Sequence, residues 1–237
     1  ELVAEQPEPL QDKTELTLPH PTLWCGKKAP ALYTLREELW VDGRKADEVQ
    51  IRFGFKTVLV DPEKGFFLNG EHLKIHGVAK HQDYAGVFNA IGAEHLQEDL
   101  RDILEIGANS VRLSHYQHPQ RMYDLCDENG LLVWAEIPMM KFLNDEALME
   151  NTESQLKELI YQNIHHPSIC FWGIQNEIAI FGESEAMYTR MQQLAQLVSQ
   201  LDGTRLSACA NLFCVSNDSK LNTLTQVVGY NIYYGWD

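Results

Sequence analysis

From about residue 57 onward, short apolar runs alternate with longer segments of helical periodicity, and this alternation constrains the fold most strongly. Repeated strand–helix units of this length form parallel sheets, so the chain is predicted to belong to the α/β class. Strands are expected at 73–78, 110–114, 131–136, 169–173, 206–210 and 227–233, and helices at 94–106, 119–129, 154–164 and 185–201.

Two architectures fit this alternation, an open doubly wound sheet and a closed (β/α)8 barrel. The first strand–helix junction has no GxGxxG loop, which disfavours a nucleotide-binding sheet. In a barrel, catalytic side chains gather at the carboxyl ends of the strands. Polar residues lie at or just after the carboxyl ends of five of the expected strands: Lys80 and His81, His115, Glu136, Asn176 and Glu177, and Tyr233. The barrel is therefore favoured, with about six of its eight strands present.

Residues 1–56 have a different rhythm. Polar and apolar residues alternate in 14–18, 32–41 and 49–53, and Asp42-Gly43 is a typical hairpin turn. The pattern predicts antiparallel strands of a β-sandwich with one buried face. The expected domains are thus 1–56 and 57–237.

Composition limits the partners. The net charge of −15 argues against nucleic acid and against an anionic membrane surface. The chain has no apolar run long enough to span a bilayer and no leader at its start, which resembles an interior cut of a longer protein. Five cysteines without a CxxC pair indicate reduced structural thiols. A cytoplasmic location is expected, with the periplasm left open.

Glu177 is the sharpest candidate for chemistry. It directly follows the apolar run that begins at Ile169, so its carboxyl is expected at the barrel mouth, where partial removal from water suits a general acid. Asn176 beside it could donate a hydrogen bond to a substrate hydroxyl. The alternative is that Glu177 only caps the helix that follows.

Two histidines and one arginine are further candidates. His81 and His115 end the first two strands and could contact substrate, or could be structural histidines. Arg112 lies within the second strand. If its guanidinium points inward it must be paired, and Glu136 or Glu177 could pair it.

The remaining candidates are groups of histidines and a cluster of aromatic residues. The histidines group as 72, 76 and 81, as 115 and 118, and as 165 and 166, and none of the groups has HExxH spacing, so no metal site is predicted. Tyr233, Tyr234 and Trp236 could stack against a substrate ring or could belong to the core. The hydroxyl of Tyr233 is expected to face the mouth.

Several stretches together resemble glycoside hydrolase family 2. Asn109–Tyr116, with Pro119 close behind, is similar to the first signature of the family, and Asn163–Glu177 is similar to its acid/base signature. Residues 77–82 and 230–236 resemble two further strand ends of the family. Residues 53–55 resemble the usual link from an immunoglobulin-like β-sandwich into the barrel.

The resemblance implies a retaining double displacement in which Glu177 is the general acid and base. It further implies that Asn176 contacts the 2-hydroxyl, that His81 and His115 line the sugar subsite, and that Tyr233 lies against the nucleophile. Arg112 and Trp236 complete the expected substrate-binding set. The family nucleophile ends the seventh strand, beyond Asp237, and Glu136 is read as a supporting carboxylate.

Two departures from the family pattern affect the expected activity. Ala79 and Lys80 replace a common Asn-Arg pair, and residues 137–140 lack the Glu and His of a magnesium site, so neither metal nor cofactor is expected. The sequence around Glu136, residues 134–138, resembles that of bacterial β-galactosidases. The expected substrate is therefore a terminal β-D-galactoside or β-linked oligosaccharide.

Two alternatives remain open, a β-glucuronidase of the same family and a carbohydrate-binding fragment without turnover. The chain on its own is expected to be inactive, and the full-length protein to be a homo-oligomer. The first and sixth strands are expected to present unpaired edges.

Overall fold

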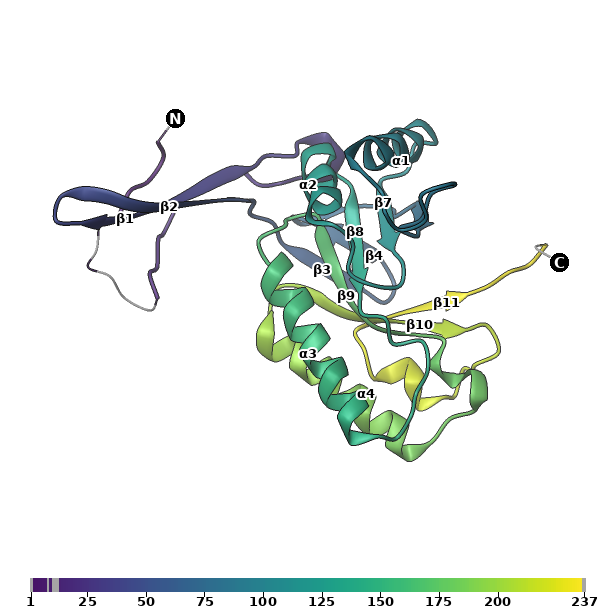
Figure 1. The fold of residues 1–237 in the computed structure, drawn as a ribbon. Coiled ribbons are helices and arrows are strands. Elements are labelled where there is room, and N and C mark those ends of the chain that lie inside the picture. Colours follow the sequence, from purple (N-terminus) through teal and green to yellow (C-terminus); the bar gives the residue numbers. More distant parts are fainter. Residues whose placement is uncertain (1, 8, 10–12, 236–237) are drawn as a thin grey trace.

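The computed structural model describes residues 2–7, 9 and 13–235, and its centre is a sheet of six parallel strands (Figure 1). They pair in the order β11-β10-β9-β8-β7-β6, so neighbours in the sheet are neighbours along the chain. A doubly wound sheet would reverse its strand order at an internal strand, whereas an unbroken order is that of a barrel wall. The partial barrel predicted from the sequence is confirmed. Its strands are β6 (Gly77–Lys80), β7 (Ser110–Leu113), β8 (Leu132–Glu136), β9 (Ile169–Asn176), β10 (Leu206–Leu212) and β11 (Val227–Asn231).

Helices connect these strands and bury one face of the sheet. The main core lies between them and includes Leu100, Tyr123, Leu156 and Trp172. A 3₁₀ helix, η3 (Lys220–Thr223), joins β10 to β11 in place of an α-helix. None of the helices in the described part of the chain is long and apolar enough to cross a membrane. The α-helices are α1 (Ala93–Glu105), α2 (Gln120–Asn129), α3 (Glu146–Asn163) and α4 (Glu185–Leu201).

The first barrel strand starts later than the pattern predicted, at Gly77 rather than at residue 73. The segment before it is held by the side chain of Asn109, which accepts from the backbone N–H of His76 and donates to the carbonyl of Lys74, both at 2.9 Å. These side-chain bonds take the place of backbone hydrogen bonds between strands, so the segment lies beside the sheet without joining it.

Other boundaries also differ from the prediction. α3 begins at Glu146 instead of residue 154, because Asp145 caps its first turn by accepting from Leu148 N–H at 3.0 Å. β9 continues to Asn176, beyond the apolar run that predicted it. β11 ends at Asn231, so Tyr233 follows the strand and does not belong to it.

A small antiparallel sheet that the sequence analysis missed covers the amino-terminal end of the barrel. It consists of β3 (Val58–Asp61), β4 (Gly65–Leu68) and β5 (Glu71–His72). Phe66 and Leu68 of this sheet pack into a second core with Trp24 and with residues near the starts of the barrel strands, Leu132, Cys170, Phe171 and Ala208. The small sheet therefore forms the floor of the barrel, opposite the mouth.

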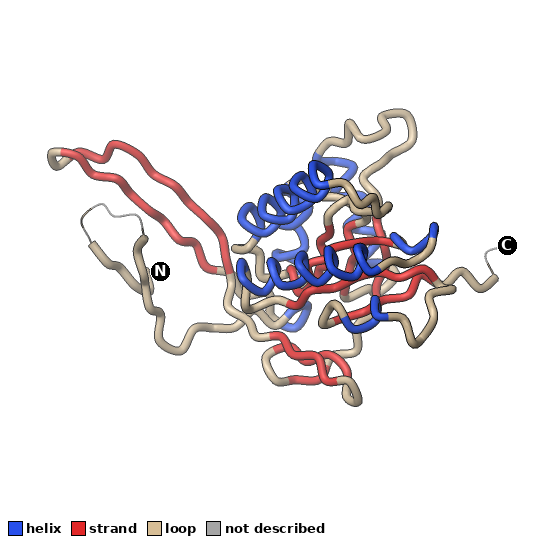
Figure 2. Tube along the Cα trace, turned by 90° about the horizontal axis from the view of Figure 1, so that it is seen from below, coloured by secondary structure: helices blue, strands red, loops and turns tan. Residues whose placement is uncertain are grey.

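The predicted hairpin at the start of the chain is present as β1 (Tyr33–Val41) and β2 (Arg44–Phe53), joined at Asp42-Gly43. It projects from the rest of the molecule as a two-stranded ribbon (Figures 1 and 2). One buried face was expected, but Trp40 and Val49 are about half exposed, because no described segment packs against the ribbon as a second sheet. The strand expected at 14–18 is not formed.

Candidate active site

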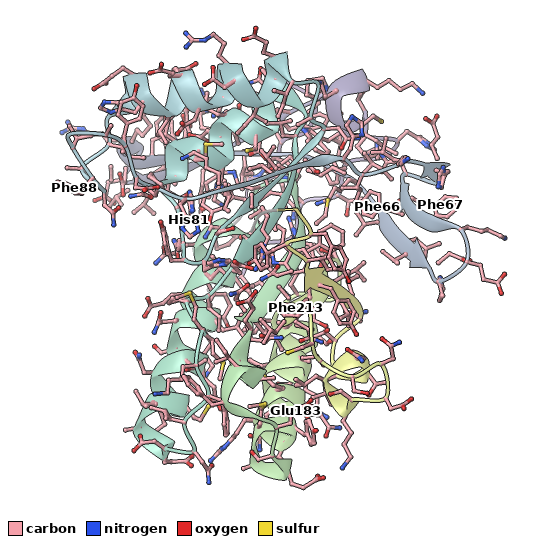
Figure 3. The ribbon with its side chains drawn as sticks, turned by 90° about the vertical axis from the view of Figure 1, so that its right-hand side faces the viewer. Phe66, Phe67, His81, Phe88, Glu183 and Phe213 are labelled. Atoms are coloured by element: carbon pink, nitrogen blue, oxygen red, sulfur yellow. The ribbon has the colours of Figure 1, made fainter. Side chains whose placement is uncertain are left out.

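The carboxyl ends of the strands bring together side chains from residues far apart in the sequence. Glu136 ends β8, Asn176 ends β9 and Asn231 ends β11. His81 directly follows β6, and His115 lies two residues after the end of β7. Figure 3 labels His81 in this region and shows Phe66 and Phe67 of the floor sheet well apart from it. The candidate site lies at the mouth, as the barrel prediction required.

Glu177 turns into the mouth through an unusual backbone conformation. Its φ of 54° and ψ of 28° lie in the left-handed region, which a residue other than glycine adopts at a cost of about 1–3 kcal/mol. Because strand residues alternate between faces, an extended Glu177 would point away from the side to which Asn176 points. The left-handed turn directs both neighbours to the same group of polar residues.

The carboxyl of Glu177 is partly buried and well held. Its Oε1 atom accepts from Asn231 Nδ2 at 2.7 Å and from the Tyr233 hydroxyl at 3.2 Å, and its backbone N–H donates to Ala210 at 2.8 Å. Glu177 occupies the N-cap position of the 3₁₀ helix η2 (Ile178–Phe181) that follows, but its side chain makes no capping hydrogen bond there.

Arg112 points into the mouth and is paired with Glu136 rather than with Glu177. Its Nε and NH2 atoms donate to the two oxygens of Glu136 at 3.0 and 3.1 Å, and the Glu136 side chain is completely buried. A buried carboxylate requires such a partner. The guanidinium also lies 5.2 Å from the centre of the Trp134 ring, a cation–π contact beneath the site.

Glu136 also fixes one histidine. Its Oε1 lies 2.5 Å from His115 Nδ1. A carboxylate only accepts, so Nδ1 carries the proton in this contact and the 3.2 Å approach of Arg112 NH2 to the same nitrogen is no hydrogen bond. The arrangement leaves His115 Nε2 available to a ligand.

His81 and His115 form one wall of the site, with ring centres 5.0 Å apart in an edge-to-face arrangement. The hydroxyl of Tyr116 lies 3.4 Å from His81 Nδ1 and accepts from the backbone N–H of Gln82 at 2.9 Å. Tyr116 therefore helps to position His81, and sequence reasoning did not single it out although it ends the first family signature.

Asn176 is oriented by its neighbours. Its Oδ1 accepts from Arg112 NH2 at 2.8 Å and from Asn231 Nδ2 at 2.9 Å. Because arginine can only donate, the atom facing it must be the amide oxygen. The amide nitrogen of Asn176 then points away from Arg112 and can donate to a hydroxyl of a ligand.

The remaining predicted site residues differ in position. Tyr233 contacts Glu177 as described and is about half exposed, and burial together with the charge of Glu177 raises the pKa of its hydroxyl. Tyr234 is almost fully exposed, and Trp236 lies outside the described residues. Lys80 faces away from the mouth, since its ammonium lies 2.7 Å from Asp99 of α1.

Asn231 is a second member of the site, besides Tyr116, that the sequence did not predict. It connects Arg112, Asn176 and Glu177 by three hydrogen bonds of 3.1, 2.9 and 2.7 Å. The predicted strand ran to residue 233, so Asn231 did not stand at a strand end in the sequence pattern, whereas β11 ends at Asn231 in the structure.

One group of possible metal ligands lies away from this site. The ligand atoms of Asp124, Asp127 and His166 lie within 4.8 Å of one another. Their atoms are already engaged: Asp127 bonds His166 Nδ1 at 2.6 Å and Ser168 N–H at 2.9 Å, and Asp124 pairs with Arg52 at 2.9 Å. The group connects α2 to the segment before β9 and is explained as a structural network. A hollow of about 600 Å³ between α1 and α2, lined by Leu100 and Arg101, also lies outside the mouth.

The fold is that of a partial TIM barrel, and Glu177, Asn176 and the two histidines gather at the strand ends where such barrels carry their active sites. Residues 59–237 match the model of the TIM barrel domain of glycosyl hydrolases family 2, and residues 2–56 match a second model of that family. The chain belongs to glycosyl hydrolase family 2.

Relatives with two activities match nearly the whole chain. A β-glucuronidase of Bacteroides fragilis is 39% identical over 95% of this chain and 33% of its own length. The crystal structure of an FMN-binding β-glucuronidase from Facaelibacterium prausnitzii has a TM-score of 0.89 at 39% identity, with 92% of this chain and 34% of that one covered. A putative β-galactosidase from Bacteroides fragilis has a TM-score of 0.86 at 38% identity, with 92% and 32% covered. The chain thus spans about a third of each relative.

Proposed function

We propose that the protein containing this chain hydrolyses terminal β-D-glycosides with retention of configuration, and that Glu177 is its general acid and base. The observation that carries the proposal is the Glu177 carboxyl, whose Oε1 is bound by Asn231 and Tyr233 while no described residue bonds to Oε2. Oε2 is therefore free to face a glycosidic oxygen.

The first step would transfer a proton from Glu177 to the departing oxygen while a carboxylate outside this chain attacks the anomeric carbon. The C–O bond to the leaving group breaks and a glycosyl ester forms. In the second step the ionised Glu177 would take a proton from water, whose oxygen attacks the anomeric carbon and releases the sugar. Glu136 is not proposed as the nucleophile, because its side chain is completely buried and both of its oxygens are bonded to Arg112 or His115.

The other site residues would bind the sugar. The Asn176 amide nitrogen would donate to the 2-hydroxyl, and His81 and His115 would line the rim of the same subsite. Arg112 would act through Asn176 and Asn231 rather than on the sugar, since four of its five N–H groups donate to protein acceptors.

A β-glucuronide is proposed as the first sugar and a β-galactoside as the second. The order rests on the relatives, because the β-glucuronidase of Bacteroides fragilis matches 95% of the chain, whereas a β-galactosidase of Thermoanaerobacterium thermosulfurigenes is 35% identical over 74% of it. The galactoside stays a candidate because the putative β-galactosidase of known structure is nearly as similar as the β-glucuronidase.

The test is a panel of nitrophenyl β-glycosides hydrolysed by the complete protein that carries these residues. Turnover of the glucuronide above the galactoside, with about a 10²–10⁴-fold loss in Glu177→Gln, supports the proposal. Binding of sugars without turnover of any glycoside would show a carbohydrate-binding module instead.

A further inference from the structure

Asn231 lies at the crossing point of the hydrogen bonds in the mouth. It accepts from Arg112 NH1 through Oδ1 at 3.1 Å, and its Nδ2 donates to Asn176 Oδ1 at 2.9 Å and to Glu177 Oε1 at 2.7 Å. The nitrogen therefore uses both of its hydrogens.

The orientation of this amide is determined by its neighbours. Arginine has only donors, so the Asn231 atom that faces Arg112 must be the oxygen, and the nitrogen must face Glu177. Arg112 itself is held by the two oxygens of the buried Glu136. A chain of contacts thus runs from Glu136 through Arg112 and Asn231 to Glu177.

This series of hydrogen bonds affects which oxygen of Glu177 can carry a proton. Oε1 accepts from Asn231 and from Tyr233, which uses both of its lone pairs in the carboxyl plane. A hydrogen on Oε1 would face the Asn231 amide hydrogen at a heavy-atom distance of 2.7 Å and would break that bond. Oε2 has no bonding partner among the described residues.

We propose that Asn231 is a positioning residue that keeps Oε1 of Glu177 as an acceptor and so places the transferable proton on Oε2. The proposal rests on the proposed function of Glu177 as general acid. In the first step Oε2 gives this proton to the leaving oxygen, and the electron pair of its O–H bond stays on the carboxylate. In the second step the same oxygen accepts a proton from the attacking water.

The proposal is tested by how strongly activity depends on the leaving group. Phenolate needs a proton to depart, whereas 2,4-dinitrophenolate leaves without one. The complete protein would be assayed with the phenyl and the dinitrophenyl β-glycoside of the sugar it turns over best, and kcat/KM would be compared because it reports only the first step. Asn231→Ala is expected to lower kcat/KM about 100-fold for the phenyl substrate and less than about threefold for the dinitrophenyl substrate.

A second variant keeps the shape of the side chain. Asn231→Asp retains an acceptor for Arg112 but puts an oxygen against Oε1, so a proton must lie between the two oxygens. It is expected to show the same selective loss with the phenyl substrate. Full activity in Asn231→Asp would overturn the proposal, because the amide donor would then be unnecessary.

Asn222→Ala is the matched control. Asn222 makes four side-chain hydrogen bonds and Asn231 makes three; those of Asn222 include one of 2.6 Å from Tyr230, and none of them reaches Glu177. It should leave both substrates near the wild-type rate. An equal loss with both substrates in Asn231→Ala would show that Asn231 only binds sugar or supports the fold, which overturns the proposal and leaves the proposed function standing. A wild-type protein inactive on every glycoside would overturn both.

Discussion

Arg112 and Glu136 face each other inside the barrel mouth with two hydrogen bonds of 3.0 and 3.1 Å, and the Glu136 side chain has no exposure to solvent. The pair connects β7 with β8 and holds His115 and Asn176, the two residues proposed to contact the sugar. Stability and activity are therefore expected to depend on the same ion pair.

Removing one partner leaves the other charge buried, so Glu136→Gln and Arg112→Met should each lower the free energy of unfolding by about 3–5 kcal/mol. The double variant should cost less than the sum of the single variants, because neither charge is then left alone. Denaturant unfolding of the four proteins measures this. Strictly additive losses would mean that the two side chains do not interact.

A buried histidine makes stability depend on pH. His118 is 3% exposed, and burial lowers the pKa of its imidazole to about 4, with Nε2 hydrogen-bonded to the Ser114 carbonyl at 3.1 Å. An unfolded histidine has a pKa of about 6.5, so between these pH values the unfolded chain binds more protons. Stability is complete above pH 6.5 and should fall by up to about 1.4 kcal/mol per pH unit toward pH 4.

Unfolding measured from pH 7 to pH 4 in His118→Gln should show a weaker pH dependence than the wild type, because glutamine does not titrate and can still donate to Ser114. The control is His72→Gln, since His72 is exposed. Burial also lowers the pKa of His165 to about 4, so part of the slope remains in both variants. An unchanged slope in His118→Gln would contradict the assignment.

The elements that could be predicted from the sequence are those whose conformation is determined by residues close to them in the chain. α4 begins and ends within the predicted bounds, since Ser184 caps its start and its apolar face is regular. Glu177 was found because an apolar strand that ends in polar residues is a local signal. The same holds for Asp42-Gly43, whose turn needs no partner from elsewhere in the chain.

What could not be predicted depends on contacts between distant residues. Asn231 gained its role from Arg112 and Glu177, which are 119 and 54 residues away. The floor sheet was missed because β4 is stabilised by packing on Phe171, a contact without any local pattern. The start of β6 was misplaced because the side chain of Asn109, not a strand partner, binds the preceding segment.

The close approach of β6 to β7 depends on Gly77. A Cβ atom there would lie 2.1 Å from the carbonyl oxygen of Ser110, and backbone cannot move aside without opening the ladder. Gly77→Ala should therefore destabilise the protein by about 1–3 kcal/mol in a denaturant titration. Gly229→Ala is the matched control on the other edge strand, because its Cβ would meet atoms no nearer than 3.5 Å. Equal losses in both variants would show that the approach at Gly77 is not the cause.

Self-association of the chain on its own is the last expectation, and it follows from the strand order. β6 and β11 are the outer strands of the sheet, so each has one edge without a partner in the described structure, and Ile232 just past β11 is 54% exposed. Open edges and exposed apolar side chains recruit other chains. Light scattering of the 237-residue chain should show oligomers, and Ile232→Lys should reduce them because charge at an edge disfavours pairing. Tyr161→Lys, on the exposed side of α3, should not. A monomer at all concentrations would show that these edges are protected.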